Sequence, residues 1–195
     1  MSNPDPLDYY AQHAEAFFER TVNLDLSGLR SRFLAKLPPR PHILDVGCGS
    51  GRDARAFREA GASVVALEPV EQLARMAEAY TGLSVVRARV EDLDCTHRFE
   101  GIWACASLLH LTPEALAGAF HRLHHALVPG GILMACFKSV PPPATETRPF
   151  TNFTAAELDL FVRRHTGFDI LSVEVESATG AEAQRWTTGF FMKPI

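Results

Sequence analysis

Three glycines spaced two residues apart follow directly after a short apolar run, and this feature limits the fold more than any other. Residues 43–51 read ILDVGCGSG, with Gly47, Gly49 and Gly51 in the turn. Glycine tolerates positive φ angles and lets the backbone come close to a ligand. Open α/β sheets bind ligands where a strand ends and the chain turns into a helix. The segment therefore predicts a strand, a ligand-binding turn and a helix.

Short apolar segments alternate with amphipathic ones along the middle of the chain. The apolar segments predict strands at 42–47, 63–68, 84–89, 102–106 and 132–137. Helical patterns lie between them, over 53–60, 70–80 and 112–127. Alternation of this kind is typical of a parallel sheet that is covered by helices on both faces.

The pattern changes after residue 138. Residues 139–153 contain four prolines and predict a loop, which is either a lid over the substrate or a plain connector. Thr154 and Glu157 form a capping box that opens a helix to about residue 165. Two alternating segments, 168–176 and 185–193, follow without a helix between them, so they must pair antiparallel. The expected fold is α/β and doubly wound, with a mostly parallel seven-stranded sheet, helices on both faces and a C-terminal antiparallel β-hairpin.

The first 40 residues predict a helical cap. Apolar residues recur at helical spacing over 8–22 and 26–37, and Pro38 and Pro39 end the second helix. A chain of 195 residues forms a single hydrophobic core of ordinary size. We therefore expect one domain over residues 1–195, with the cap at 1–40.

Composition and charge disfavour several classes of function. Nineteen Lys and Arg against 23 Asp and Glu give a net charge of −4, so no positive field attracts nucleic acid or an anionic membrane. No apolar run approaches the roughly 20 residues of a membrane span, and the first residues lack a signal-peptide pattern. The four cysteines show no metal-ligand spacing. We expect a cytoplasmic protein with no metal and no nucleic-acid or membrane partner.

A carboxylate stands where a ribose would bind. Glu68 ends the second predicted strand, seventeen residues after Gly51, and can accept hydrogen bonds from both ribose hydroxyls. The G-x-G-x-G spacing departs from the dinucleotide pattern G-x-G-x-x-G, and the chain has no Gly-Lys-Ser/Thr phosphate-binding loop. Asp45, next to the turn, repels phosphate. It favours a ligand with an ammonium group, such as S-adenosylmethionine.

Four segments in order resemble the motifs of the class I S-adenosylmethionine-dependent methyltransferases. They are ILDVGCGSG at 43–51, VVALEP at 64–69, FEGIWACASLLHL at 99–111 and LVPGGILMACF at 127–137. The resemblance runs from about Tyr9 to the C-terminus and implies a Rossmann-like methyltransferase fold with S-adenosyl-L-methionine as cofactor. Residues 47–54 and 103–111 look most like the short bacterial methyltransferases grouped with tellurite-resistance proteins.

The same resemblance implies which residues hold the cofactor. Asp45 would meet the methionine ammonium group, with Gly47 and Gly49 under the ligand. Many relatives hold the adenine amino group with an Asp where Arg89 stands, so this contact is expected from neighbouring residues. The expected cofactor set is Asp45, Gly47, Cys48, Gly49, Gly51, Arg52, Glu68, Pro69, Val90, Glu91, Asp92, Ala104 and Ala106.

Methyl transfer from a sulfonium depends on positioning and exclusion of water, and needs a general base only if the acceptor must lose a proton. His110 is the candidate base or substrate contact; the alternative is a histidine satisfied by the backbone. Tyr9 and Tyr10 are further candidates, which either close over the cofactor or pack in the core. Lys138 and Arg52 are candidates to meet an anionic acceptor.

The predicted function is methyl transfer to a small-molecule acceptor by in-line displacement. The alternative is an S-adenosylmethionine-binding module without turnover. A nucleotide-dependent oxidoreductase is disfavoured by the missing G-x-G-x-x-G, and nucleic-acid methylation by residues 106–109, which replace an Asn/Asp-Pro-Pro-aromatic motif. His121, His124 and His125 recur at helical spacing, but no further ligand stands in register, so we expect no metal site.

Overall fold

A seven-stranded sheet forms the centre of the protein in a computed structural model, which describes residues 5–141, 146, 148–177 and 185–195. The strands are β1 (His42–Val46), β2 (Ser63–Leu67), β3 (Val85–Val86), β4 (Phe99–Cys105), β5 (Leu127–Lys138), β6 (Asp169–Ser177) and β7 (Arg185–Met192). The α-helices are α1 (Pro6–Gln12), α2 (Ala14–Thr21), α3 (Ser27–Leu34), α4 (Arg52–Glu59), α5 (Glu71–Thr81), α6 (Pro113–Ala126) and α7 (Ala155–His165). Two short 3₁₀ turns are η1 (Val90–Asp92) and η2 (Leu108–His110).

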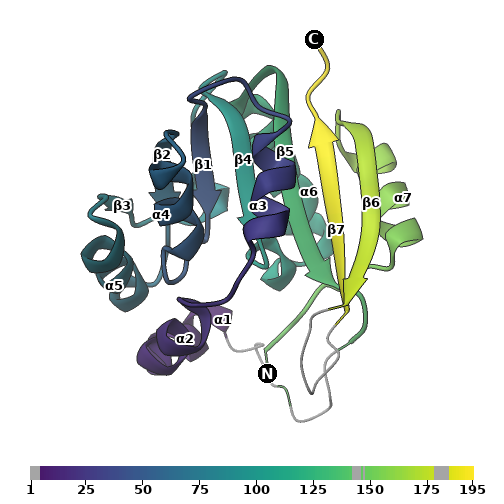
Figure 1. Cartoon of the computed structure of the whole chain (residues 1–195). Helices are drawn as coiled ribbons and strands as arrows, with labels where there is room; N and C mark the ends of the chain where they lie inside the picture. Colours follow the sequence, from purple (N-terminus) through teal and green to yellow (C-terminus); the bar gives the residue numbers. More distant parts are fainter. Residues whose placement is uncertain (1–4, 142–145, 147, 178–184) are drawn as a thin grey trace.

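The strand order is β3-β2-β1-β4-β5-β7-β6 (Figure 1). Strands β1 to β5 pair in parallel, whereas β7 pairs antiparallel with both β5 and β6. This confirms the predicted fold class, a mostly parallel sheet that ends in an antiparallel hairpin. The parallel strands all finish at the end of the sheet where α1 and α2 lie, at the bottom of Figure 1.

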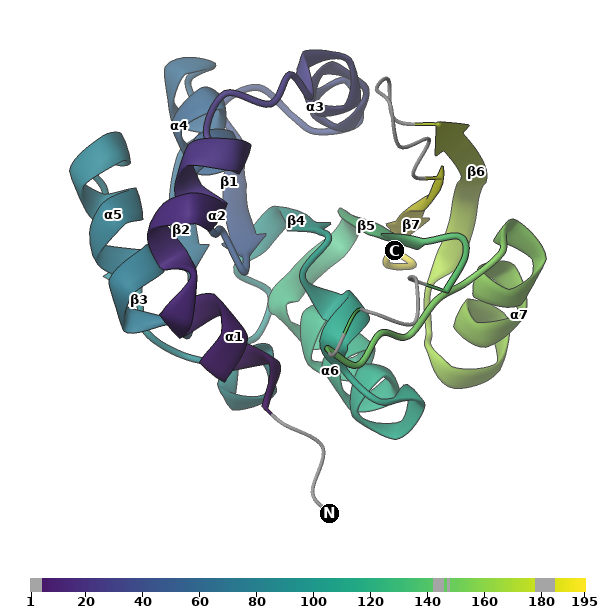
Figure 2. The same ribbon diagram turned by 90° about the horizontal axis from the view of Figure 1, so that it is seen from below.

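Helices cover both faces of the sheet (Figure 2). On one face, α6 and α7 bury apolar side chains at helical spacing, among them Phe120, Leu123 and Leu158. On the other face, Phe33 of α3 and Phe57 of α4 pack on the Trp103 ring of β4, with ring centroids 5.3 and 5.1 Å away. The strands between these two layers are therefore apolar on both sides, as the sequence pattern predicted.

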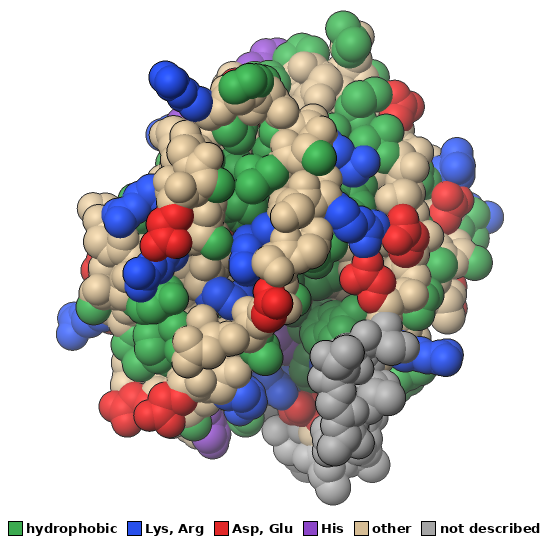
Figure 3. Space-filling model, viewed as in Figure 1, with side chains coloured by type: hydrophobic (Ala, Val, Ile, Leu, Met, Phe, Trp, Pro, Cys, Tyr) green, Lys and Arg blue, Asp and Glu red, His purple; other side chains and the backbone are tan. Residues whose placement is uncertain are grey.

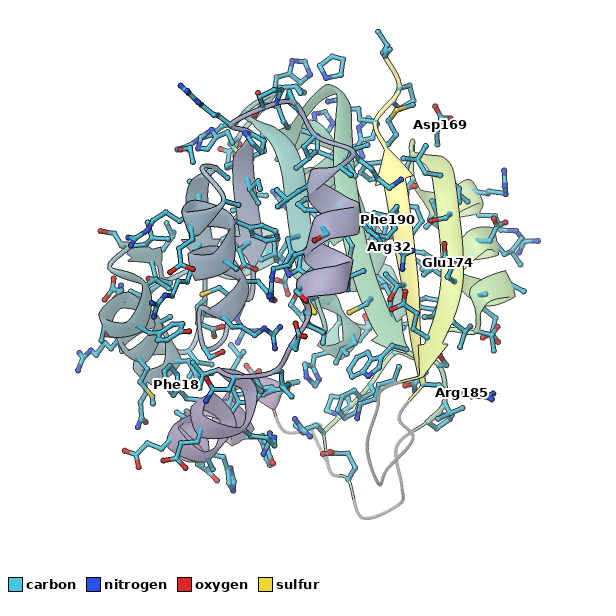
Figure 4. All side chains as sticks on the ribbon, viewed as in Figure 1. Phe18, Arg32, Asp169, Glu174, Arg185 and Phe190 are labelled. Atoms are coloured by element: carbon cyan, nitrogen blue, oxygen red, sulfur yellow. The ribbon has the colours of Figure 1, made fainter. Side chains whose placement is uncertain are left out.

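Arg32 joins α3 to the C-terminal hairpin (Figure 4). Its guanidinium forms ion pairs with Glu174, at 2.8 Å, and with Glu176, both on β6. It also lies 5.2 Å from the centroid of the Phe190 ring on β7, and Lys36 Nζ lies 5.3 Å from the same centroid. These contacts hold the end of the N-terminal region against the last two strands.

Several predicted elements differ in extent, and β4 and β5 begin before the strands expected at 102–106 and 132–137. The expected helix over 8–22 is interrupted at His13, whose ring Nδ1 lies 2.8 Å from the Tyr9 carbonyl oxygen and whose backbone leaves the helical region. The expected strand over 84–89 is reduced to the two residues of β3. Arg87 turns back to form ion pairs with Glu71 and Glu78 of α5. No helix in the described part of the chain is both long and apolar enough to cross a membrane.

Candidate active site

The glycine turn lies at the carboxyl end of β1 and needs glycine at each of its three positions. Gly47, Gly49 and Gly51 all have positive φ, between 55° and 77°. A Cβ atom on Gly47 would lie 2.6 Å from the Ser107 Cβ, and one on Gly51 would lie 2.6 Å from Thr81 Cγ2. Gly51 therefore serves close packing against α5, while Gly47 allows the segment after β4 to approach the turn.

Asp45 carries a buried oxygen without a partner. The residue is 3% exposed, and among the described residues nothing hydrogen-bonds to its Oδ2 atom. Burial and the nearby Asp53 raise the pKa of this carboxyl well above its usual range. A buried, unpaired carboxylate is costly unless a cation or donor meets it. The site therefore fits the ammonium group of S-adenosylmethionine, which is a cation and also a hydrogen-bond donor.

Glu68 ties the glycine turn to the start of α5. Its Oε2 accepts a hydrogen bond from the Gly49 backbone N–H, and its Oε1 accepts one from Val70 N–H, both at 2.9 Å. Burial raises the pKa of this carboxyl. Each carboxylate oxygen retains a second lone pair, so a ribose hydroxyl can still donate to it. Pro69, between Glu68 and Val70 in the sequence, is half-buried.

A buried group at the N-terminus of α4 was not foreseen from the sequence. Asp53 accepts hydrogen bonds from Arg30 at 2.7 Å, from Arg52 at 2.6 and 3.1 Å, and from Trp103 Nε1 at 3.1 Å. Arg52 also donates to the Thr21 carbonyl oxygen at 3.3 Å. The Arg52 guanidinium thus joins α2 to Asp53, and its ligand contact stays a prediction. Arg30 and Trp103 lie too far from Asp53 in the sequence for any local pattern to link them.

A cleft of about 380 Å³ opens beside this group, between the α2–α3 connection, α4 and α5. Figure 3 shows basic side chains between α3 and α4 on this face. Arg30, Arg52 and Arg55 line the cleft, but the first two are paired with Asp53, and Arg55 is paired with Glu59 at 2.8 Å. Because Arg30 and Arg52 share the one carboxylate of Asp53, this group keeps a net positive charge beside the cleft, which Asp25 also lines.

The residues expected near the adenine lie on η1. Val90 is buried, Glu91 is half-buried and Asp92 is exposed, and Asp92 Oδ2 accepts a hydrogen bond from the Arg89 backbone N–H at 3.1 Å. The Arg89 side chain forms an ion pair with Asp5. Asp5 in turn caps α1 by accepting from Leu7 N–H at 3.0 Å. Arg89 therefore connects the first helix to η1.

Ala104 and Ala106, the cofactor contacts expected at the end of β4, lie in different environments. Ala104 is fully buried in the core. Ala106 has a φ of +55°, rare for a residue other than glycine, and its N–H lies 3.1 Å from Cys136 Sγ. Cys48, in the glycine turn, donates its N–H to the Leu67 carbonyl oxygen at 2.9 Å and so continues the pairing of β1 with β2. The tight geometry at Ala106 turns the chain toward His110.

Tyr10 and His110 form a hydrogen bond across the carboxyl edge of the sheet. Tyr10 Oη lies 2.8 Å from His110 Nε2, and His110 Nδ1 lies 3.0 Å from the Pro149 carbonyl oxygen. Because a carbonyl only accepts, Nδ1 carries the proton and Nε2 accepts from Tyr10. Burial lowers the pKa of His110 to about 4, so the ring is neutral at pH 7. The Tyr10 ring also packs on the Phe17 ring, with centroids 5.1 Å apart, and its closure over the cofactor stays a prediction.

Arg148 gathers the aromatic residues of this region. Its guanidinium lies 4.2 Å from the Tyr9 ring centroid and donates to Tyr10 Oη at 3.0 Å. The sequence interpretation missed Arg148 because it lies in a proline-rich loop without a motif. The described part of the expected lid is docked on η2: Thr151 N–H donates to the Leu109 carbonyl oxygen at 2.7 Å. Residues 142–145 and 147 of that lid lie outside the described residues.

The helix α6 histidines lie away from this region. His124 packs on the Phe168 ring at 5.0 Å, and His121 lies 4.6 Å from His125, ring centroid to centroid. Within the described ranges, no three His, Cys, Asp or Glu side chains are grouped so that they could hold a metal ion.

The chain matches known methyltransferases in sequence over part of its length. Residues 43–131 match the family model described as a methyltransferase domain. The malonyl-[acyl-carrier protein] O-methyltransferase of Enterobacter lignolyticus (strain SCF1) is 31% identical over 104 residues, which are 51% of this chain and 41% of that protein. The chain thus spans about two fifths of the length of this relative.

Solved methyltransferase structures share the fold. The 1,6-didemethyltoxoflavin-N1-methyltransferase of Burkholderia thailandensis, with bound 1,6-didemethyltoxoflavin and S-adenosylhomocysteine, is similar with a TM-score of 0.77 at 24% identity, covering 100% of this chain and 93% of that one. The N-methyltransferase NodS of Bradyrhizobium japonicum WM9, in complex with S-adenosylhomocysteine, has a TM-score of 0.70 at 11% identity, covering 94% and 100%. At these identities the likeness shows the fold alone.

The family match covers the glycine turn, Glu68, η1, β4 and His110, and the fold of the whole chain is similar to that of the solved methyltransferases. Residues 43–131 therefore resemble a methyltransferase domain in sequence, and the whole chain shares its fold with solved methyltransferases.

Proposed function

We propose that the protein transfers a methyl group from S-adenosylmethionine to a small-molecule acceptor. The observation that carries this proposal is the buried Asp45 oxygen, which has no partner in the described part of the chain and lies beside a turn of three glycines with positive φ. A folded chain keeps such a charge only where a ligand or a pKa shift compensates it. A ligand ammonium group is the compensation that the family match suggests.

Asp45, Glu68 and η1 would hold the cofactor. Asp45 would pair with the methionine ammonium group, and Glu68 would accept from the ribose while its bonds to Gly49 and Val70 keep it in place. Phe17 covers the turn, because its ring carbon Cε1 would lie 3.0 Å from a Cβ on Gly49. Since α1 and α2 lie over this edge of the sheet, they would exclude water from the reacting atoms.

Tyr10 and His110 would take up the proton that the acceptor loses. The bound cofactor supplies a methyl group on a sulfonium: the acceptor lone pair forms the new bond, and the electrons of the carbon–sulfur bond stay on sulfur. The acceptor proton would pass to Tyr10 Oη as the Tyr10 proton passes to His110 Nε2. The Arg148 N–H that donates to Tyr10 Oη would hold this hydroxyl in place, so that its own proton points to His110 Nε2.

The relatives do not specify the acceptor atom, because one is an O-methyltransferase and two are N-methyltransferases. Placement among the tellurite-resistance-related methyltransferases stays a prediction from residues 47–54 and 103–111, and so does the cytoplasmic location. The predictions of one domain over 1–195 and of a cap at 1–40 also remain proposals; of the cap, α1 and α2 lie over the site, whereas α3 packs on the sheet.

Two measurements test the proposal. Titration of the protein with S-adenosylhomocysteine should give saturable binding, whereas NAD should not bind. Incubation with S-adenosylmethionine and small acceptors should then produce S-adenosylhomocysteine. Binding without turnover for every acceptor would favour the non-catalytic binding module. Absence of binding would contradict both functions.

A further inference from the structure

Lys138 offers a positive charge at the acceptor side of the site. It is the last residue of β5, and its Nζ atom lies 3.9 Å from the centroid of the Phe150 ring. Within the described residues, no carboxylate lies within ion-pair distance of Lys138 Nζ. Partial burial, and the nearby Arg148, lower the pKa of this ammonium group. The free donors of Lys138 are therefore available to a ligand.

The other charges around Lys138 compensate one another. The Arg148 guanidinium forms two hydrogen bonds to Glu146, with Nε donating to Oε1 at 2.8 Å and Nη2 to Oε2 at 2.5 Å. His110 is neutral at pH 7, since burial lowers its pKa to about 4. The Arg148–Glu146 pair is neutral as a unit, so Lys138 leaves this cluster with one uncompensated positive charge.

The cluster adjoins the glycine turn through two chains of contacts. Phe150 packs on His110 with ring centroids 4.7 Å apart, and His110 is bonded to Tyr10. Tyr10 packs on Phe17, which lies over Gly49. The second chain is the backbone from His110 back to Ser107, whose Cβ is in contact with Gly47. Lys138 thus lies on the far side of the Tyr10–His110 pair from the predicted cofactor groups.

We propose that Lys138 anchors a carboxylate on the acceptor, so that the substrates are small carboxylic acids with a separate hydroxyl or amino group that receives the methyl group. This inference rests on the proposed function, which defines the acceptor side of the site. A monoanion neutralises the one uncompensated charge, and a flat acid can also contact the aromatic rings of Tyr9 and Phe150. Neutral acceptors leave Lys138 without a partner.

Matched acids and amides test the inference. A panel of small hydroxy and amino acids and their primary amides, led by 4-hydroxybenzoate and 4-hydroxybenzamide, is assayed for formation of S-adenosylhomocysteine. Binding of each compound to the protein saturated with S-adenosylhomocysteine is measured in parallel. We expect acids to exceed their amides in kcat/KM and affinity by about ten- to a hundredfold, the range of one hydrogen bond to a charged group.

Lys138→Met should remove this preference, mainly through KM, and Lys138→Arg should restore most of it. Lys36→Met is the matched control, because Lys36 also lies on an aromatic ring, that of Phe190, but on the sheet face that packs against α3. Lys36→Met should leave the acid-to-amide ratios of kcat/KM and of affinity unchanged. Binding of S-adenosylhomocysteine should be the same in all variants.

Equal use of acids and amides by the wild-type protein would overturn the inference, as would an acid preference that survives in Lys138→Met. A loss of S-adenosylhomocysteine affinity in Lys138→Met would also overturn it, because Lys138 would then hold the carboxylate of the cofactor. A protein that binds S-adenosylhomocysteine but neither binds nor methylates any acid of the panel counts against it too. These results differ from failure of the proposed function, in which the wild-type protein does not bind S-adenosylhomocysteine.

Discussion

Asp45→Asn should stabilise the protein while it weakens cofactor binding. Asp45 is 3% exposed and its Oδ2 atom has no partner among the described residues, so burial of the charged carboxylate is only partly offset, by the nearby Arg52. Asparagine keeps the shape and removes the charge. A buried polar group without a partner costs about 1–3 kcal/mol, and more if it is charged. Because the amide of the variant also lacks a partner there, we expect a net gain of about 1 kcal/mol.

The gain should depend on pH. The pKa of Asp45 is raised in the folded protein, so the folded state binds the proton more tightly than the unfolded state. Wild-type stability is therefore reduced as pH rises above the unfolded pKa near 3.8, and the advantage of Asp45→Asn should vanish below that pH. At pH 7 a gain of about 1 kcal/mol corresponds to a rise in Tm of about 2–4 °C for a chain of this size.

Binding should change in the opposite direction. Loss of a hydrogen-bonded ion pair to the ligand ammonium group should weaken S-adenosylhomocysteine about ten- to a hundredfold. Thermal unfolding of both proteins, alone and with S-adenosylhomocysteine, measures both effects. A lower Tm for the unliganded variant, or equal ligand-induced shifts in the two proteins, would refute the reasoning.

Three further predictions concern the groups around this site. Gly51→Ala should lower the free energy of unfolding by about 1–3 kcal/mol in denaturant titrations, because φ is +77° and the new Cβ would lie 2.6 Å from Thr81 Cγ2; unchanged midpoints would contradict this. Asp53→Asn should lower Tm at pH 7. Burial opposes the charge of Asp53, but the hydrogen bonds from Arg52 and Arg30 outweigh it and lower the pKa of this carboxyl in the folded protein. The stabilisation by Asp53 is therefore present above the pKa of the unfolded chain and disappears as pH falls through the pKa of the folded protein. A difference in Tm between wild type and Asp53→Asn that stays the same in acid would show that the charge of Asp53 is not its cause. His110→Ala should reduce kcat but not cofactor affinity, and the acid limb of the wild-type kcat/KM profile should lie near pH 4; a limb near 6.5 would show a solvated imidazole.

The sheet and the glycine turn were predictable because their signals are local. Apolar runs, glycines at fixed spacing and the Thr154–Glu157 capping box each determine structure within a few residues, and the capping box is present in the structure. Boundaries were less predictable where tertiary contacts decide them. The strand expected at 84–89 stops after Val86 because Arg87 pairs with two carboxylates of α5. The alternation of residues within the strand gives no sign of these carboxylates.

The polar groups of the site depend on contacts that are distant in sequence. Asp53 binds Arg30, 23 residues before it, and Trp103, 50 residues after it. Arg148 reaches Tyr10 across 138 residues. Asp45 and Glu68 could be named in advance because each belongs to a motif at the carboxyl end of an apolar strand, Asp45 within β1 and Glu68 directly after β2. Arg148 and Asp53 could not, because only the packing of α1, α3 and the proline-rich loop against the sheet brings their partners together.

Methyl transfer itself tests the account most directly. Wild-type protein, His110→Ala and Lys36→Met are incubated with methyl-labelled S-adenosylmethionine and the paired acids and amides, and labelled product and S-adenosylhomocysteine are quantified together. In the wild-type protein and Lys36→Met we expect one S-adenosylhomocysteine for each labelled product, with acids preferred over amides. In His110→Ala both compounds should form more slowly. Binding of S-adenosylmethionine with no labelled product from any acceptor would contradict it.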